Sequence, residues 1–559
     1  MQIQPRQTQT YQLRGINLSD EYIEGSMSDC LNMSTRRFPF FSTRRGREEL
    51  KGSPYPAGGF TNVIGMTAWN KLVVLSTKNF STDPATDAPE GKAYIYYDGV
   101  LVKAQTGDDP GLVSDSPKKF AVVNTKLVIM PDKKYIDLNV QRLVDMQVEI
   151  NISNTITVGS PSVEDPYQTI TISNGYSTYK SQFDKLEKDD WVILNLSGGS
   201  NVTDLYVCFV EATQSSNNLV VTFKRNPTIQ SGTYTSGSVE RHIPDFDYIC
   251  GADNRLWGCV NSEQTIYVSA LGDPNMFYDY EGTGSSSWAV AVTSEGVFSG
   301  CIKLGSSVLF FKEYCLHKVV GGNPTEYMMY TYVMEGVRAG CDETMQVINE
   351  TLFYLGINGV FVFSGGTPSN ISSQLGDKEL LEGVAGTDGK NYYLSCKEGD
   401  RRHLFVYSMK EGMWVREDDS KVDYFTRNNN DLLMVVNGRI YINDTGEFGN
   451  TDWYIKFNDI RENTYKRGSL AGGELNKKKY SKLILRAEMP KGSYCTVKIS
   501  CDNGRWEQVG RILGSFENVT RIVLPLNRCD KFGLQLEGKG DFTLMNLSRV
   551  YTTGSDRNE

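Results

Sequence analysis

Short apolar runs joined by tight turns recur along most of this chain, and they constrain its fold more than any other feature. Each unit is an apolar run, a turn containing Asn, Asp, Glu or Gly-Ser, and a second apolar run. Runs rich in Val, Ile, Tyr and Phe favour β-strands, and Asn-Gly and Asp-Gly are strong hairpin signals. The predicted hairpins are Ala68–Leu75, Ala121–Met130, Cys250–Cys259, Ile302–Phe311, Val347–Leu355, Val384–Leu394 and Leu433–Ile442. We therefore expect an all-β fold.

The spacing of the turns points to a repeated architecture. Measured between the turn residues Asn70, Asn124, Asn254, Ser306, Glu350, Asp388 and Asn437, successive steps are 54, 130, 52, 44, 38 and 49 residues. All but one of these steps lie near the roughly 40–50 residues of a propeller blade. The sequence therefore predicts a β-propeller of about seven blades. Two separate β-sandwiches would also place strands at short intervals and are the alternative.

The single oversized step indicates an inserted domain. From about Val144 to Glu240 the composition shifts to Ser, Thr and Asn. Within this segment, strands are predicted at Thr169–Ser173, Trp191–Leu196, Leu205–Ala212 and Asn218–Phe223. A small β-domain of this size, placed between two blades, restores a regular series of blades.

After the last blade, the chain is expected to form a separate β-sandwich. Its predicted strands are Leu483–Ala487, Cys495–Ser500, Trp506–Gly510, Arg521–Leu526, Phe532–Leu536 and Phe542–Leu547, with alternating inward and outward residues. Short helices are expected only at Asp20–Met33 and Ser373–Val384. The predicted organisation is an extended arm (1–57), a first propeller segment (58–143), the inserted β-domain (144–240), a second propeller segment (241–462), a linker (463–479) and the C-terminal β-sandwich (480–559).

Composition narrows the functional classes. The net charge of −9 and the pI near 5.3 do not indicate a general nucleic-acid binder. The eleven cysteines form no CxxC pair, which favours free thiols over disulfides or a metal site. No apolar stretch is long enough to span a membrane, and the polar Met1–Tyr11 does not resemble a signal peptide. We expect a chain made in a cytoplasm, without cofactors.

No catalytic motif emerges from the sequence. The three histidines, His242, His317 and His403, lie in no nucleophile elbow, zincin or deaminase pattern. Neighbouring carboxylates such as Asp418 and Asp419 have the character of turn acids rather than of a glycosidase pair. Glycine-containing turns lack the Lys-Ser/Thr of a phosphate-binding loop. The sequence therefore predicts a protein that is not an enzyme, with no catalytic, cofactor-binding or metal residues.

Basic and aromatic residues alternate in the predicted arm. Such interleaving fits nucleic-acid contact or docking on a protein neighbour, and we favour docking. The predicted interface residues are Arg36, Arg37, Phe38, Phe40, Phe41, Arg44, Arg45 and Arg47. Removal of Met1–Glu49 is then expected to impair assembly while the propeller stays folded.

Several separate motifs resemble one known family. They are Leu13–Asn17, Asp29–Ser34, Arg44–Arg47, Asn254–Gly258, Ile266–Pro274, Leu309–Glu313, Gly359–Ser364, Arg528–Asp530, Leu536–Phe542 and Gly554–Asp556. Together they resemble the tail hub or nozzle proteins of tailed bacteriophages, often called stabilisation proteins, which have β-propeller cores. The resemblance covers most of the chain except the inserted domain.

This resemblance implies a structural virion protein in a phage tail, made in the cytoplasm of the host bacterium. It implies a homo-oligomeric ring, with a hexamer favoured, through which the genome passes during ejection without specific binding. Other tail proteins and portal or adaptor proteins would be its neighbours. The alternative is a carbohydrate- or receptor-binding, depolymerising tail protein on a propeller scaffold. In that alternative Trp506 is a candidate platform for glycan, although a tryptophan in a strand is more often a core or sheet-face residue.

Overall fold

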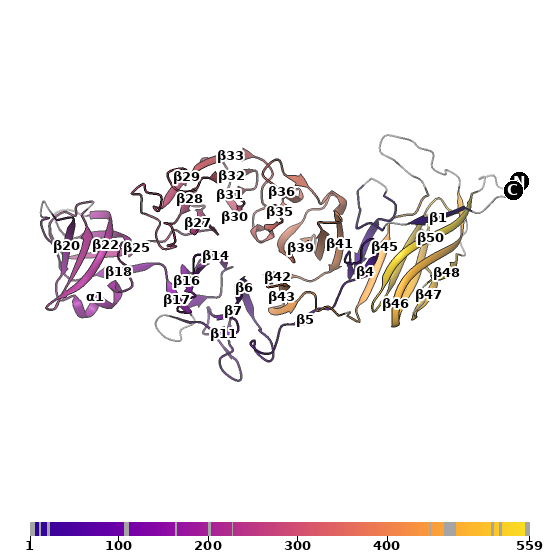
Figure 1. Cartoon of the computed structure of the whole chain (residues 1–559), viewed down its shortest axis with the longest axis horizontal. Coiled ribbons are helices and arrows are strands. Elements are labelled where there is room, and N and C mark those ends of the chain that lie inside the picture. The colour runs from indigo at the N-terminus through magenta and orange to yellow at the C-terminus, as the bar shows by residue number, and fades with distance from the viewer. Residues whose placement is uncertain are drawn as a thin grey trace. The chain divides into compact units, whose positions relative to one another are not determined.

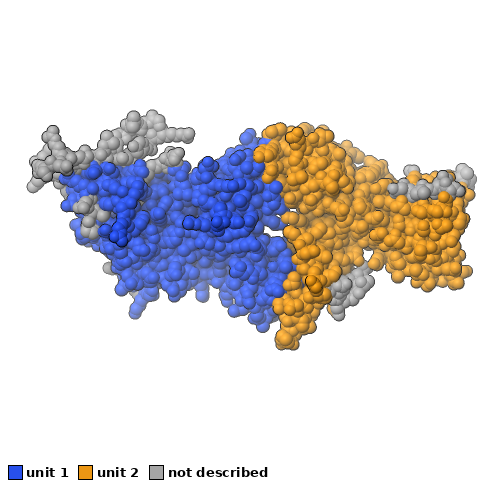
Figure 2. Space-filling model, turned by 180° about the vertical axis from the view of Figure 1, so that it is seen from behind, with its two compact units in different colours: residues 1–76, 334–559 blue, residues 77–333 orange. Residues whose placement is uncertain are grey.

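The computed structural model describes residues 6–10, 13–19, 23–104, 111–161, 165–199, 203–225, 227–447, 449–462, 477–515, 519–524 and 528–553. Its contacts define two compact units, shown in different colours in Figure 2. Unit 1 contains Met1–Ser76 and Met334–Glu559, and unit 2 contains Thr77–Val333. No helix among the described residues is long and apolar enough to cross a membrane.

Regular structure is almost entirely β, in a seven-bladed β-propeller arrangement with additional sheets (Figure 1). This confirms the predicted fold class. Unit 2 contains three complete blade sheets: β12 (Lys103–Ala104) with β14 (Lys119–Val123), β15 (Lys126–Met130), β16 (Lys134–Asp137) and β17 (Arg142–Asp145); β26 (Tyr248–Ala252), β27 (Arg255–Val260), β28 (Thr265–Val268) and β29 (Trp288–Ala291); and β30 (Phe298–Leu304), β31 (Ser307–Lys312), β32 (Cys315–Val320) and β33 (Met328–Val333).

Unit 1 also contains three blade sheets: β34 (Gln346–Ile348), β35 (Thr351–Gly356), β36 (Gly359–Phe363) and β37 (Ser369–Asn370); β38 (Leu381–Thr387), β39 (Asn391–Glu398), β40 (Arg401–Ser408) and β41 (Met413–Asp418); and β42 (Val422–Asn428), β43 (Asp431–Val436), β44 (Arg439–Ile442) and β5 (Glu48–Glu49). The hairpin of β6 (Val63–Trp69) and β7 (Lys71–Ser76) also lies in unit 1. Unit 2 holds β8 (Lys78–Asn79) and β9 (Thr86–Asp87), which pair together, and β10 (Lys92–Tyr97), which pairs with β11 (Val100–Leu101) and β13 (Leu112–Val113). Short 3-10 turns occur at Asp342–Thr344 and Ser373–Leu375.

All seven predicted hairpins are present as pairs of antiparallel strands. Their turns explain why asparagine recurs there: Asn70, Asn124, Asn254, Asn349 and Asn437 all have a positive φ between 47° and 58°. Asparagine tolerates this left-handed conformation better than most residues do. The local sequence thus determines where each blade folds back on itself.

The segment predicted as an insertion contains an eight-stranded sheet with its own core. The strands are β18 (Val148–Ile152), β19 (Ile156–Val158), β20 (Tyr167–Ile172), β21 (Trp191–Ser197), β22 (Thr203–Ser215), β23 (Asn218–Lys224), β24 (Gly232–Tyr234) and β25 (Ser236–Arg241). Alternate residues of these strands point into a core that one helix, α1 (Tyr176–Phe183), closes with Tyr179 and Phe183 (Figure 1). The first and last strands pair, with Val148 opposite Arg241.

The C-terminal region forms a ten-stranded arrangement that includes four strands from the N-terminal arm. Its strands are β1 (Arg6–Thr10), β2 (Met27–Leu31), β3 (Met33–Ser34), β4 (Phe41–Thr43), β45 (Asp452–Phe457), β46 (Lys478–Cys501), β47 (Glu507–Ser515), β48 (Val519–Val523), β49 (Phe532–Lys539) and β50 (Thr543–Thr553). The first half of the 24-residue β46 pairs with β48 and β50, and its second half pairs mainly with β47 and β49. The strand therefore belongs to both layers of the predicted sandwich.

Both predicted helices are wrong where the structure describes them. Met27, Cys30 and Leu31 have the i, i+3, i+4 spacing of a helix, yet Met27–Leu31 is a strand that pairs with β45. At the second site only Ser373–Leu375 forms a helical turn, and Gly376 ends it with a φ of 83°. Tertiary pairing overrides weak local propensity at the first site. Most of the predicted linker, 463–476, lies outside the described residues.

Candidate functional site

The N-terminal arm covers the outer strand of one propeller blade. The amide of Ile16 donates to the carbonyl of Trp414 at 2.8 Å, and the amide of Asn32 donates to that of Glu417 at 2.6 Å. Gly15 is required at the crossing, because a Cβ there would lie 2.3 Å from the Trp414 carbonyl oxygen. The arm thus satisfies and shields the edge of β41, which would otherwise be open to another chain.

The same arm also joins the sandwich. On its other side β2 pairs with β45, with Cys30 opposite Ile455, while β4 pairs with β50, with Phe41 opposite Leu544. Buried residues of the arm, of three blades and of the sandwich belong to one continuous hydrophobic core. In Figure 1, β4 and β45 lie beside the yellow strands of the sandwich. The arm is therefore an internal connector of unit 1.

The apolar residues predicted to dock on a neighbour lie mostly inside this connector. Phe41 is fully buried, and Phe38 packs against the same core. Phe40 is half-buried. Phe41 is consequently unavailable to a neighbouring subunit, which corrects its assignment as an intersubunit anchor.

The basic residues of the segment also have partners within the chain. Arg36 pairs with Asp541 at 3.9 Å, Arg37 with Glu488 at 2.7 Å and Arg45 with Asp444 at 3.4 Å. Arg44 lies 3.6 Å from Asp418, and Arg47 pairs with both Glu417 and Asp418. The predicted pairing of arginine with acidic groups is thus met inside unit 1, and docking of the remaining exposed surface on another subunit stays a prediction.

The Arg44–Arg47 cluster makes two adjacent carboxyls behave differently. Burial raises the pKa of Glu417, despite the charges of Arg47 and Arg44. Burial acts in the same direction on Asp418, but Arg47 and the Ser420 amide outweigh it and hold the pKa of Asp418 below its usual value. Both carboxyls contact arm residues, so they serve to attach the arm to β41.

A hollow of about 560 Å³ lies on one side of the arm. Ile16, Leu18 and Asp29 of the arm line it together with residues that include Lys378 and His403. His403 is 9% exposed, and its Nε2 lies 3.2 Å from the carboxylate of Glu398, although neither ring nitrogen has hydrogen-bond geometry with a residue that the structure describes. Burial and the charge of Arg416 lower the pKa of this imidazole, so it is neutral near pH 7.

The charged groups around His403 form a closed network. Asp29 accepts two hydrogen bonds from Arg416, at 3.0 and 3.1 Å, and a third from the hydroxyl of Tyr454. Lys378 donates to Glu398 at 2.8 Å. These groups neutralise one another in pairs, and the network again connects the arm to β41 and β45.

A second hollow of about 400 Å³ adjoins the first, and both are lined by Leu18 and Ser28. Its other walls come from β45, from the segment after β45 and from the sandwich, where Trp506 is 41% exposed. The sequence indicates Trp506 only in the alternative function, and no sequence signal predicts its exposure. Trp506 packs against Gly533 of β49, and the pairing of β49 with β45 and β46 places the indole beside the arm.

In unit 2 the outer strand β33 is exposed and unshielded. It pairs only with β32 among the described strands. Met328, Tyr330 and Tyr332 on one side of the strand are all about half exposed, and Val333 is 94% exposed. Thr331 points to the other side, where its hydroxyl lies 2.9 Å from Nδ1 of His317. Nothing in the sequence pattern distinguishes this strand from a buried one.

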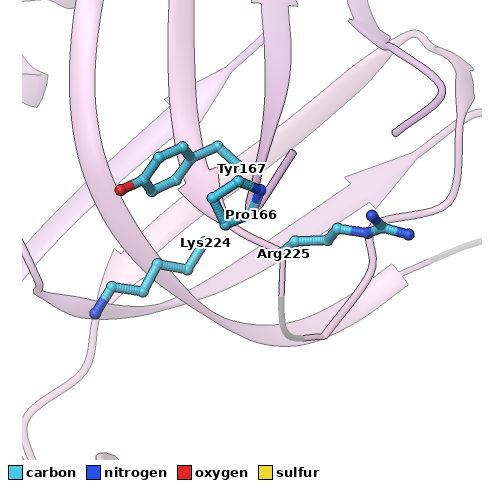
Figure 3. Close-up of a pocket in the computed structure, with 4 residues that line it drawn as sticks. All are labelled: Pro166, Tyr167, Lys224 and Arg225. Atoms are coloured by element: carbon cyan, nitrogen blue, oxygen red, sulfur yellow. The ribbon is translucent and has the colours of Figure 1, made fainter. Parts of the chain in front are cut away.

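The insertion has a hollow of about 550 Å³ of its own, lined by Pro166, Tyr167, Lys224 and Arg225 (Figure 3). Figure 3 shows the Tyr167 ring and the Lys224 side chain extending in the same direction from neighbouring strands, while Arg225 points away from them. Lys224 pairs with Asp189 at 2.9 Å. These residues provide no set of convergent polar groups.

The other predicted candidates for chemistry have structural partners. His317 is held between Ser294 and Thr331, and its pKa is lowered to about 4, mainly by burial. His242 contacts Glu240 at 2.9 Å. All eleven cysteines are free thiols. No group of three or more His, Cys, Asp or Glu side chains that could hold a metal ion occurs among the described residues.

Neither a protein-family model nor a curated protein sequence matches this chain. Solved structures with partial likeness include an exo-β-1,3-galactanase from Phanerochaete chrysosporium, with 11% identity over 53% of this chain and 92% of that one and a TM-score of 0.20. PorZ of the Porphyromonas gingivalis type-IX secretion system has 11% identity over 89% of this chain and 77% of that one, with a TM-score of 0.27. Hsv2 of Kluyveromyces lactis has 11% identity over 53% and 95%, with a TM-score of 0.26. At such low scores these likenesses carry no argument about activity, partners or location.

Proposed function

We propose that this chain is a non-enzymatic structural subunit of a phage tail, and that its copies assemble into a ring, six in number, through which the genome leaves the particle. The family resemblance of the arm, blade and C-terminal motifs supports the virion role. The exposed strand β33 supports assembly between copies and is the observation on which the proposal rests.

The chemistry of β33 is that of an interface rather than of a protected edge. Edge strands that must stay single usually carry charged residues or proline. The segment from Tyr327 to Val333 contains neither, and it presents methionine, tyrosine and valine to solvent. Tyrosine and methionine are enriched at protein interfaces. An extended segment of another subunit would pair with the free backbone groups of β33 and cover these side chains.

The blade that ends in β41 is a model for such pairing within the same chain. There the arm lies along the outer strand, and the first five residues of β41 are buried. In β33, by contrast, only Met329 is substantially covered by its own blade. We infer that a segment of a neighbouring copy pairs with β33 and covers it, as the arm pairs with β41 and covers it.

A closed ring needs two different contact surfaces on each subunit. The sandwich offers a second apolar edge in β48, which pairs with β46 alone among the described strands. Val519 and Val523 of β48 and Leu513 of β47 are exposed there. This edge is the second contact surface in our proposal.

The continuous core of unit 1 suits a load-bearing ring. Arm, blades and sandwich cannot move apart without breaking a core that spans all three. A propeller has short, protected strand edges and is a stiff scaffold. Such a subunit would keep its shape while the genome passes and neighbouring tail proteins remain attached.

The test is to place charge on β33. The double variant Y330K/Y332K is expected to weaken subunit association about tenfold or more, because covered ammonium groups without partners are costly. Light scattering over a concentration series measures the oligomer, and electron microscopy of the assembled protein gives its symmetry. The matched control is Tyr167→Lys, on an exposed tyrosine of the insertion.

Wild-type protein that stays monomeric at high concentration and is absent from purified particles would contradict the proposal. So would a Y330K/Y332K variant that assembles like the wild type while its melting temperature is unchanged. A ring of a different symmetry would retain the assembly role and exclude the hexamer.

A further inference from the structure

The hollow beside Trp506 has the composition of a ligand site. Its volume of about 400 Å³ falls within the range of small-molecule pockets. Three separate parts of unit 1 form its walls: the arm, the end of β45 with the following residues, and the sandwich. Its polar residues are Asn17, Ser19, Ser28, Lys456, Asn458, Asp459 and Arg461.

Trp506 is held in place by its surroundings and is not part of the core. Its benzo edge rests against Gly533, where an added Cβ would lie 2.9 Å from the ring atom Cη2. The ammonium group of Lys456 lies 5.7 Å from the indole centroid, at cation–π distance. The indole is nevertheless 41% exposed, so a large flat apolar surface faces the hollow.

The polar groups near the indole are positioned by the backbone of the arm. The side-chain amide of Asn458 donates to the Asn17 carbonyl at 2.7 Å and to the Ser26 hydroxyl at 2.8 Å. The Ser19 hydroxyl donates to the side-chain oxygen of Asn17 at 2.6 Å. The wall of the hollow is therefore ordered before any ligand enters, which reduces the entropy cost of binding.

The charge of the hollow is positive. Asp459 is already paired with Lys531. Among the described residues, the Lys456 ammonium group contacts only the indole face, and the Arg461 guanidinium makes no hydrogen bond or ion pair. An unpaired guanidinium beside an exposed aromatic surface fits a ligand that has both an apolar face and an anionic group.

We propose that this hollow binds an anionic pyranose, a sugar residue carrying a carboxylate or a phosphate. One face of a pyranose ring presents C–H groups that pack against an indole, whose face is electron-rich. The carboxylate or phosphate pairs with Arg461 and Lys456, and the ring hydroxyls bond to the Asn and Ser side chains of the wall. This function is separate from ring assembly, because neither β33 nor the exposed residues Leu513, Val519 and Val523 of the second contact surface line the hollow.

Calorimetric titration of the protein tests the proposal with three tetrasaccharide probes: one containing glucuronate, a glucosamine tetrasaccharide carrying phosphate, and neutral chitotetraose. At least one anionic probe is expected to bind about tenfold more tightly than the neutral one. The two anionic probes distinguish a uronic acid from a sugar phosphate as the natural group.

Two substitutions separate the apolar from the charged contribution. Trp506→Ala is expected to weaken the binding of all three sugars about tenfold. Arg461→Gln should remove only the tighter binding of the anionic sugars over the neutral one. Arg401→Gln, in the adjoining hollow, is the matched control and should bind like the wild type. Light scattering of each variant should give the wild-type oligomer, which keeps this outcome independent of the assembly proposal.

Three results would overturn the inference. They are no binding of either anionic probe by wild-type protein, unchanged binding by the folded Trp506→Ala variant, and tighter binding of a short single-stranded oligonucleotide through the same two residues. The last result would identify the hollow as a nucleic-acid contact, since bases also stack on indole and phosphates also pair with arginine.

Discussion

The inserted domain and the C-terminal sandwich are both β-structures with alternating strands, yet they are built into the chain in opposite ways. Every buried residue of the insertion's core lies between Val148 and Val239. The core around the sandwich instead runs from Leu13 to Tyr551 and includes the arm and three blades. The first design makes a removable module, and the second makes the sandwich, the arm and the blades depend on one another.

Deletion has the largest expected effect. Replacing residues 149–240 by a short Gly-Ser link should leave the blades of unit 2 folded, as well as unit 1, because Val148 and Arg241 are already paired neighbours. Removing residues 1–49 should unfold the sandwich and its adjacent blades, since it takes away six fully buried core residues and the blade strand β5. This replaces the expectation that the propeller stays folded without Met1–Glu49. Hydrogen exchange resolved by strand measures both, and a folded sandwich in the arm deletion would break the comparison.

Truncating one buried phenylalanine in each region comes next. Phe41→Ala and Phe223→Ala should each cost about 3–5 kcal/mol, because both rings are fully buried. Phe41→Ala should lower the protection from hydrogen exchange in β41, β46 and β50 together. The loss at Phe223 should be confined to β18–β25. If Phe223→Ala also lowers protection in β46, the insertion is not independent.

Buried ion pairs provide a third, smaller contrast. In unit 1, Arg549 pairs with Glu462 and Glu24. In the insertion, Arg241 pairs with Asp190 at 2.7 Å. All of these side chains except that of Glu24 are nearly fully buried. Replacing either arginine by methionine leaves a buried carboxylate unpaired and should cost about 3 kcal/mol. The Arg549 variant should loosen the arm as well as the sandwich, as read by proteolysis of the first fifty residues. The double variants R549M/E462M and R241M/D190M should recover much of the loss.

The smallest expected effect is the pH dependence of stability, which we expect in unit 1 and not in the insertion. The pKa of His403 is lowered by burial and by Arg416, so folded unit 1 favours the neutral ring. Its stabilisation is full above the unfolded pKa of about 6.5 and is lost as the pH falls below it. Between pH 7 and 5.5 unit 1 should lose stability, by no more than roughly 1 kcal/mol for one group with this unfolded pKa, and His403→Gln should flatten that slope. The insertion, 148–241, contains no histidine and should show no such slope in hydrogen exchange.

The sequence is informative where structure is local and uninformative where it is not. Asn and Gly turns identify all seven hairpins, because a positive φ is a property of a few adjacent residues. The placement of the arm depends on partners more than 400 residues away, such as Phe457 opposite Met27, and no pattern within the arm encodes them. For the same reason the residues around Phe41 predict an intersubunit contact, whereas the structure buries that ring inside unit 1.

The candidate site illustrates the same limit. Trp506 and Arg461 are 45 positions apart and meet only because β45 pairs with β49, and β49 with β46. The sequence does not predict the exposure of β33 either. Its alternating residues have the pattern of any strand that packs one face against a neighbouring blade. Residue type indicates strands in both cases, and only the assembled sheets separate covered faces from open ones.

The pairing of the arm with the end of the chain also sets an order of events during synthesis. The arm emerges from the ribosome well before β45 and β50, with which it pairs, because these strands follow about 420 to 545 residues later. At 5–20 residues per second this is a wait of roughly 25–100 s, while the insertion can fold as soon as it is exposed. An incomplete chain therefore cannot finish unit 1, and only a fully translated subunit carries the closed core.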